Sequence, residues 1–275
     1  MTVYLGKNPV GVGRIVEKKV AKEKYGLTVD SFLGDVDADG NYVTPSEPFE
    51  VNLAGVKSVP DYGFAYKFML NEKLIKLIAN DVTSVGSGAF LYACSAEEFS
   101  NVENKNAEIE VSFDNLEIVD KAEAFKNMLY LRIGSKIKIS FKKLKKIAAA
   151  QAFNSFCGLA DANFDEIFPS LEEISGNSCL TNCSALMTDD VRTFSKVKKI
   201  TGGATKSYRT FDAIYSRNTV WNFPSATEFT GYIWNGGTSY PGEIHFSAAN
   251  QAAIEACEGY DYKWGFAGAT IFFDL

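Results

Sequence analysis

Phe113-Asp-Asn-Leu116-Glu-Ile-Val119 is one of five phrases that place apolar side chains at positions 0, +3 and +6, with mostly polar or charged residues between them. The other four phrases begin at Phe141, Phe168, Phe194 and Phe223, so the starts are separated by 28, 27, 26 and 29 residues. A period of roughly 20 to 50 residues is typical of a solenoid, in which each unit buries its apolar face against its neighbours. The phrases therefore predict a repeat solenoid.

Two earlier stretches fit the same template, Leu53-Ala-Gly-Val56-Lys-Ser-Val59 and Ala79-Asn-Asp-Val82-Thr-Ser-Val85, and they start 26 residues apart. The longer gap of 34 residues to Phe113 predicts an exposed insertion over residues 97–107. Seven units therefore span residues 51–229. Just before two of the phrases the residues alternate between apolar and polar, as in Ile109-Glu-Val111-Ser and Ile137-Lys-Ile139-Ser, which predicts strands there.

A second apolar landmark follows five of the phrases after 11 or 12 residues, with a partner four residues further on. The pairs are Phe64/Phe68, Phe90/Cys94, Phe125/Leu129, Phe153/Cys157 and Cys179/Cys183. A four-residue spacing puts both side chains on one face of a helical turn, so we expect an inward-pointing helical turn in each unit. The chain has five cysteines, and the equivalent positions of Cys94, Cys157 and Cys183 favour buried free thiols over a disulfide framework.

The two ends of the chain do not follow the repeat. Residues 1–48 are predicted to form a separate N-terminal module, with an edge strand over 2–5 and a stretch, 14–25, that fits either a strand or a short amphipathic helix. Residues 49–243 are assigned to the solenoid. Residues 244–275 are predicted to form a C-terminal cap, because a solenoid must cover its last apolar face. This cap would contain strands at 244–246 and 269–273, and a helix over 248–257 with Ser247 as its N-cap.

Composition argues against two classes of partner. The net charge of −6 disfavours a protein that binds nucleic acid by neutralising phosphates, and no apolar run approaches the roughly 18 residues needed to span a bilayer. The first residues, Met-Thr-Val-Tyr-Leu-Gly-Lys, lack the pattern of a secretory signal. We therefore expect a protein made in the cytoplasm, with neither nucleic acid nor a membrane as its partner.

The units, in which Phe-Pro-Ser-Leu-x-x-Ile precedes Ala-Phe-x-x-x-Cys, resemble the BspA-type leucine-rich repeats of bacterial surface proteins over about two thirds of the chain. The ending, from Phe246-Ser-Ala-Ala-Asn-Gln to Ala-Thr-Ile-Phe-Phe-Asp-Leu275, is similar to that of repeat proteins encoded in prophages of gut Firmicutes. The opening, with Tyr4-Leu-Gly and Leu33-Gly-Asp-Val-Asp, points the same way. The resemblance implies a leucine-rich-repeat-like solenoid, a β-rich α+β fold of short strands and helical turns, in a non-enzymatic protein of a bacteriophage virion.

The same resemblance implies what this protein would contact. The N-terminal module would bind other virion proteins in a multicopy assembly, and the repeats would present a surface to a host protein or glycan. The alternative is an adhesin of the same repeat family at the bacterial cell surface. The sequence shows neither an export signal nor a wall anchor, which favours the virion.

Six lysines in residues 136–146 suggest a polyanion site, but the repeat register favours a different interpretation. At positions +4 and +5 successive units read Lys145-Lys146, Glu172-Glu173 and Lys198-Lys199, with Glu117 before them and Glu228 after them. Stacked strands about 4.8 Å apart bring such residues side by side. We therefore expect rows of opposite charges that pair across the units.

Motifs for metal binding and catalysis are weak. Asp35, Asp37 and Asp39 reproduce the first half of a calcium loop, but the twelfth position is Ser46 instead of a bidentate acid, which favours a plain acidic turn. His245 is the single histidine, and neither a zinc-protease motif, a phosphate-binding glycine loop nor a nucleophile elbow is present. We therefore expect neither a cofactor, a metal nor catalytic residues.

The strongest binding candidates are aromatic residues that break the repeat pattern near the C-terminal end. They are Tyr208, Tyr215, Trp221, Tyr232, Trp234 and Tyr240. Tyrosine and tryptophan are favoured in recognition surfaces, including those that stack on sugars. The alternative interpretation is that several of them fill the core of irregular units.

Overall fold

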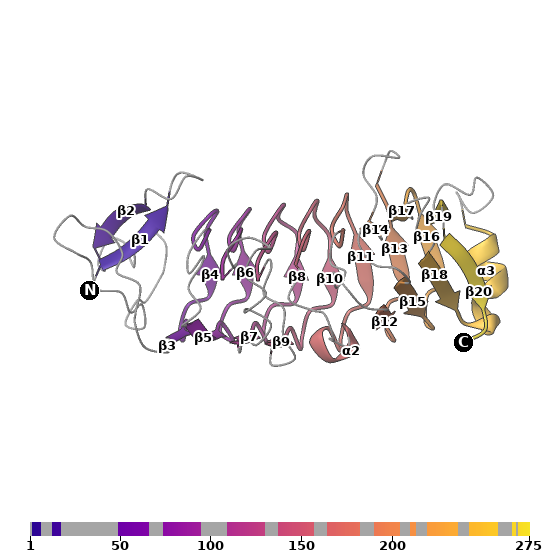
Figure 1. Cartoon of the computed structure of the whole chain (residues 1–275), viewed down its shortest axis with the longest axis horizontal. Helices are drawn as coiled ribbons and strands as arrows, with labels where there is room; N and C mark the ends of the chain where they lie inside the picture. Colours follow the sequence, from indigo (N-terminus) through magenta and orange to yellow (C-terminus); the bar gives the residue numbers. More distant parts are fainter. Residues whose placement is uncertain are drawn as a thin grey trace.

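The computed structural model shows a parallel β-solenoid, elongated along its stacking axis (Figure 1). It describes residues 2–6, 13–17, 49–65, 74–94, 109–129, 137–156, 164–181, 190–203, 210–212, 219–235, 242–257, 266–267 and 269–275. We call one turn of this solenoid a rung. The predicted insertion at 97–107 lies outside the described residues. Among the described residues, no helix is long and apolar enough to cross a membrane.

One side of the solenoid consists of two sheets, and most of their strands lead into a phrase. In the first sheet, β3 (Phe49–Asn52), β5 (Leu74–Ile78), β7 (Ile109–Ser112) and β9 (Ile137–Ser140) pair in this order. In the second, β12 (Asp190–Thr193), β15 (Thr219–Phe223), β18 (Gly242–Phe246) and β20 (Ala269–Phe273) do the same. The strands predicted from the alternation at Ile109 and Ile137 are therefore confirmed.

A second side consists of the short strands within the phrases. β4 (Ser58–Val59) pairs with β6 (Ser84–Val85). A five-stranded sheet follows, made of β8 (Ile118–Val119), β10 (Lys146–Ile147), β11 (Glu173–Ser175), β13 (Lys199–Thr201) and β16 (Glu228–Thr230). Outside the phrases, a separate three-stranded sheet contains β14 (Phe211–Asp212), β17 (Trp234–Asn235) and β19 (Phe266–Ala267). Each of the seven predicted phrases thus carries one short strand of the second side.

Two rows of phenylalanine rings run through the core between these sides. Phe113 and Phe141, the first residues of two phrases, stack with their centroids 5.2 Å apart. Phe125, from the second landmark, stacks 4.9 Å from Phe153 and meets Phe113 edge to face at 5.0 Å. These rings are fully buried, and each aromatic pair adds roughly 0.5–1.5 kcal/mol beyond the area it buries. The rows therefore hold successive rungs together.

The second landmark is not a helical turn, and that prediction was wrong. Phe90 and Cys94 are both buried as expected, but they lie in a chain of linked turns, and Cys94 has a positive φ of 58°. The amide of Ala93 donates to Phe90 O three residues back, at 3.0 Å, while the amide of Phe90 donates across to Ala124 O on the next rung, at 2.7 Å. Hydrogen bonds between rungs thus replace those a helix would form within itself. Phe68, Cys157 and Cys183 lie outside the described residues.

A short helix interrupts the first side. α2 (Phe164–Ile167) follows β9 in the chain and precedes β12, and Ile167 O accepts a hydrogen bond of 2.8 Å from the amide of Phe141. Arg192, on β12, is completely buried beside it. The Arg192 Cζ lies 4.6 Å from the Phe164 ring centroid and 5.3 Å from that of Trp221, so the guanidinium is held between aromatic faces.

The ends of the chain match several of the predicted elements. β1 (Thr2–Gly6) pairs antiparallel with β2 (Gly13–Glu17), so the strand interpretation holds for 14–17, and 18–48 lie outside the described residues. Ser247 caps a helical segment by accepting from the amide of Ala249, at 3.3 Å. This segment starts as the 3₁₀-helix η2 (Ala248–Asn250) and continues as α3 (Gln251–Glu255).

Candidate interaction surface

The outer face of the five-stranded sheet from β8 to β16 carries eight charged side chains that we call the charge ladder. They are Glu117, Lys145, Lys146, Glu172, Glu173, Lys198, Lys199 and Glu228. The strands pair in parallel register, so that residues at the same position of successive phrases lie side by side. Because side chains alternate along a strand, position +5 faces outward and position +6 faces the core.

The residues at position +4 form two ion pairs in one row. Lys145 Nζ lies 3.0 Å from Glu117 Oε2, and Lys198 Nζ lies 3.6 Å from Glu172 Oε2. In both pairs the lysine reaches back to the preceding rung. The side chains are between 51% and 64% exposed, so these pairs lie in water and contribute only about 0–1 kcal/mol each.

The residues at position +5 form a second row with the opposite direction of pairing. Lys146 Nζ lies 2.9 Å from Glu173 Oε1, and Lys199 Nζ lies 2.6 Å from Glu228 Oε1, each on the following rung. The hydrogen bond to Glu228, together with its charge, raises the pKa of Lys199 above the usual value for lysine. The predicted rows of opposite charges are therefore confirmed, and four lysines balance four glutamates.

Two further lysines of the lysine-rich stretch also contact polar groups of the preceding rung. Lys142 Nζ lies 2.6 Å from Asp114 Oδ2, and this hydrogen bond and the charge of Asp114 raise the pKa of Lys142. Lys143 Nζ donates to Asn115 Oδ1 at 2.7 Å. Three of the five described lysines of the stretch therefore pair with carboxylates of the same chain, which weakens its interpretation as a polyanion site.

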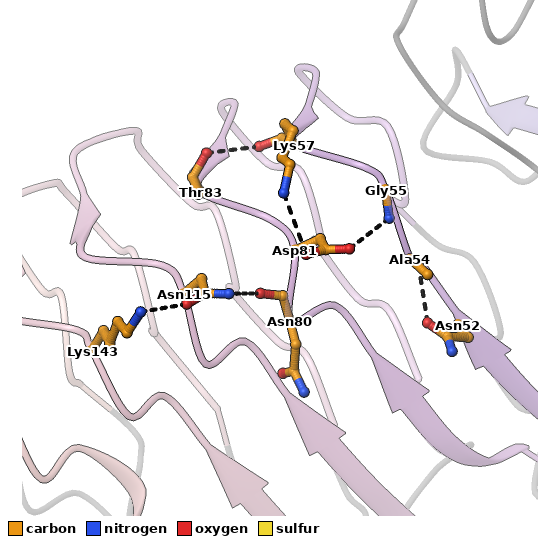
Figure 2. Close-up of polar contacts among 9 residues, drawn as sticks. All are labelled: Asn52, Ala54, Gly55, Lys57, Asn80, Asp81, Thr83, Asn115 and Lys143. Atoms are coloured by element: carbon orange, nitrogen blue, oxygen red, sulfur yellow. Dashed lines mark hydrogen bonds and ion pairs between the residues drawn. The ribbon is translucent and has the colours of Figure 1, made fainter.

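Polar side chains continue this pattern at the corner between the two sides (Figure 2). Asp81 Oδ2 accepts from the amide of Gly55 at 2.7 Å, and Asp81 Oδ1 accepts from Lys57 Nζ at 3.3 Å. The backbone N–H of Gly55, and after it the Lys57 ammonium, lower the pKa of Asp81. Thr83 Oγ1 donates to Lys57 O at 3.2 Å, so three side chains join the first two phrases.

The same corner joins the second phrase to the third and the third to the fourth. Asn115 Nδ2 donates to Asn80 O at 2.5 Å and accepts, through its Oδ1, from Lys143 (Figure 2). Asn80 Oδ1 accepts from the amide of Asp114 at 3.1 Å. Asn52 Oδ1 caps the first phrase by accepting from the amide of Ala54 at 3.0 Å. These contacts fix one rung against the next and leave the corner polar.

A second row of alternating charges, which the sequence analysis missed, crosses the sheet of β3, β5, β7 and β9. Glu50, Lys76, Glu110 and Lys138 occupy adjacent strands in register, and Lys76 Nζ lies 3.2 Å from Glu110 Oε2. All four residues stand three positions before their phrase. Aligning the units at position −3 would have revealed the row.

The six aromatic candidates do not form one described cluster. Trp221 is only 1% exposed and packs in the core against Arg192, so its proposed role in binding is wrong. Tyr232 is half-buried, and its backbone bridges to Gly203 through two hydrogen bonds of 3.0 Å. Trp234 lies on β17, paired with Phe211. Tyr208, Tyr215 and Tyr240 lie outside the described residues.

His245 and the acidic groups near it stand at the C-terminal end of the first side. Its Nδ1 lies 2.7 Å from Asp274 Oδ1, its Nε2 lies 3.3 Å from Glu243 Oε2, and its ring stacks on Phe272 at 4.6 Å. Among the described residues, no group of three or more histidine, cysteine, aspartate or glutamate side chains could hold a metal ion. Asp35, Asp37 and Asp39 lie outside the described residues.

Comparison with known proteins does not assign the chain to a family. No model of a known protein family matches the chain, and a search of curated proteins finds no relative.

Proposed function

We propose that the chain is a non-enzymatic structural and recognition protein of a bacteriophage particle, present in several copies. The observation that supports a structural role is the solenoid itself, in which rows of buried rings and ion-paired outer faces join rung to rung. Such an array is a stiff element that presents a long surface. The resemblance of both chain ends to prophage-encoded repeat proteins supports the assignment to a virion.

In this proposal the repeats are BspA-like leucine-rich repeats, and residues 1–48 attach the solenoid to other virion proteins. The separate pairing of β1 with β2 supports a distinct N-terminal module, because among the described residues these strands pair with no strand of the repeats. The exposed rungs would then project from the particle toward a protein or glycan of the host. Tyr232 and Trp234 remain the candidates for this contact.

Residues 244–275 act as the cap. Asn250 Nδ2, at the start of α3, donates to Pro224 O at 3.2 Å, and the Cys257 sulfur accepts from the amide of Phe229 at 3.4 Å. The helical segment therefore lies against the last phrase, beside β16. Covering the end of a sheet in this way protects strand edges that would otherwise pair with other chains.

The test is electron microscopy of purified phage particles labelled with an antibody raised against this protein. We expect labelling at a constant position on the particle and none on particles from a strain in which the gene is deleted. Labelling confined to the bacterial surface would contradict the proposal and favour the adhesin. Hydrolysis of a glycan by the purified protein would contradict both.

A further inference from the structure

Each rung of the charge ladder carries a single sign, and the sign changes from one rung to the next. Lys145 and Lys146 share one rung, and Glu172 and Glu173 share the following one. Small, half-buried side chains lie beside the ladder, one residue past the inward position of each phrase: Ala148, Ser175, Thr201 and Thr230. Because these neighbours are short, the longer charged side chains are accessible to another molecule.

The alternation makes this face complementary to itself in one orientation. Two copies can pack face to face around a two-fold axis that lies in the plane of contact, runs parallel to the strands and passes between β10 and β11. It places Lys145 and Lys146 opposite Glu172 and Glu173 of the second copy, and likewise Glu117 opposite Lys198. An axis along the solenoid would instead place each rung opposite the same rung, with like charges facing.

We propose that the charge ladder is a self-association surface, and that its partner is a second copy of this chain packed antiparallel along the solenoid axis. The proposal goes beyond the virion function and does not depend on it. The ladder forms one intrachain pair per charge, whereas an ammonium has three N–H groups and a carboxylate two oxygens, so each member can take a further partner.

A second copy fits this face better than other charged molecules do. A polyanion or a polycation carries one sign and would meet like charges on every other rung. A partner that fits must carry charges that alternate in sign at the strand spacing of about 4.8 Å. Another parallel β-solenoid with the same alternation of charges meets this requirement. The described ladder shows that this chain itself meets the requirement.

The association should be weak, specific in orientation and sensitive to salt. Charge complementarity selects orientation more than it adds affinity, and well-packed interface centres are poor in charged residues. The contact would consist mainly of charged side chains, so we expect a dissociation constant of about 10 µM to 1 mM. Salt at about 0.5 M, where the screening length is only a few ångströms, should dissociate the dimer.

The experiment is sedimentation of the full chain over a range of concentrations at low and high salt. We expect a monomer–dimer equilibrium at low salt that weakens at least tenfold in about 0.5 M salt. The variant Lys145→Gln/Lys146→Gln/Glu172→Gln/Glu173→Gln should weaken it at least tenfold at low salt. Circular dichroism would show that the variant is folded, and the salt series on the unmodified protein tests the proposal independently.

The matched control is Lys76→Gln/Glu110→Gln, which neutralises an ion pair of the other row, on the sheet of β3 to β9. It should leave the association unchanged. A chain that stays monomeric at millimolar concentration and low salt would overturn the proposal. So would an association indifferent to salt, or one that both variants weaken equally.

Carbodiimide cross-linking of a mixture of ¹⁴N- and ¹⁵N-labelled chains tests the orientation. Links between the two isotopic forms should join Lys145 or Lys146 to Glu172 or Glu173. Intermolecular links confined to residues outside the ladder would refute this surface, even if the protein dimerises.

Discussion

Lys146 and Ile147 are neighbours in the sequence but face opposite environments. Ile147 is fully buried, whereas Lys146 reaches Glu173 on the outer face. The two-residue strand turns successive side chains to opposite sides, and every phrase repeats the same choice. A shift of one position within the phrase therefore decides whether a side chain contributes to the core or to the charge ladder.

Charge reversal tests the ladder at this scale. Lys145→Glu/Lys146→Glu replaces two attractive pairs, with Glu117 and Glu173, by repulsive ones. We expect the melting temperature to fall by roughly 2–4 °C at low salt, and by less at high salt. Adding Glu117→Lys and Glu173→Lys should restore part of the loss. An unchanged melting temperature would show that the ladder adds nothing to stability.

Asp81 predicts a dependence of stability on pH. The Gly55 amide and Lys57 lower its pKa in the folded chain below the usual value of 3.8. The stabilising contribution is therefore fully present above about pH 4 and disappears as the pH falls through the lower, folded-state pKa. Thermal melts between about pH 2 and pH 6 should show a smaller loss on acidification for Asp81→Asn than for the unmodified chain. Parallel curves for the two proteins would contradict this assignment.

At the scale of elements, α2 marks a change in the first side of the solenoid. Its residues Phe164 and Ile167 still point into the core, so the helix supplies the apolar side chains that a strand supplies on other rungs. Arg192 and Trp221 occupy the inward position two residues before their phrases, as Val111 does in a regular unit. The guanidinium of Arg192 therefore packs between the rings of Phe164 and Trp221.

Substitution of Arg192 tests this packing. Arg192→Ala leaves a cavity between Phe164 and Trp221, and we expect the free energy of unfolding to fall by about 3 kcal/mol. Arg192→Met keeps most of the side-chain volume, so it should cost less than Arg192→Ala. Urea titrations measure both changes. Equal losses for the two variants would show that charge, rather than volume, matters at this site.

The elements also show where sequence patterns reach their limit. The spacing of Phe90 and Cys94 fits a helical turn and a pair of linked turns equally well, because both conformations bring residues four apart to one side. What distinguishes them is the hydrogen bond from the Phe90 amide to Ala124 on the next rung, which is a tertiary contact. The phrase residues were predictable because seven copies repeat one signal. The burial of Arg192 and Trp221 was also predictable, because position −2 faces inward in other units.

On the scale of the whole molecule, the solenoid has no single centre. Phe141 stacks on Phe113 and Phe168, at 5.2 and 5.4 Å, and is completely buried. Phe273, on the last strand, stacks on Phe246 at 5.9 Å and is only partly buried. In a linear array each rung is stabilised by its neighbours, so a residue at an end has fewer contacts to lose.

This difference predicts a gradient of sensitivity along the chain. Phe141→Ala should lower the free energy of unfolding by about 3–5 kcal/mol, whereas Phe273→Ala should lower it by about 1–2 kcal/mol. Urea denaturation followed by circular dichroism measures both. Equal losses would indicate one cooperative core in place of a row of coupled rungs.

The alternating signs of the charge ladder also constrain how such an array can change its length. Deleting residues 168–193 would remove one rung and bring Lys145 and Lys146 beside Lys198 and Lys199. Deleting residues 168–222 would remove two rungs and bring the same lysines beside Glu228. Duplication or loss of repeats in this region therefore preserves the pairing of charges only when the units are gained or lost two at a time.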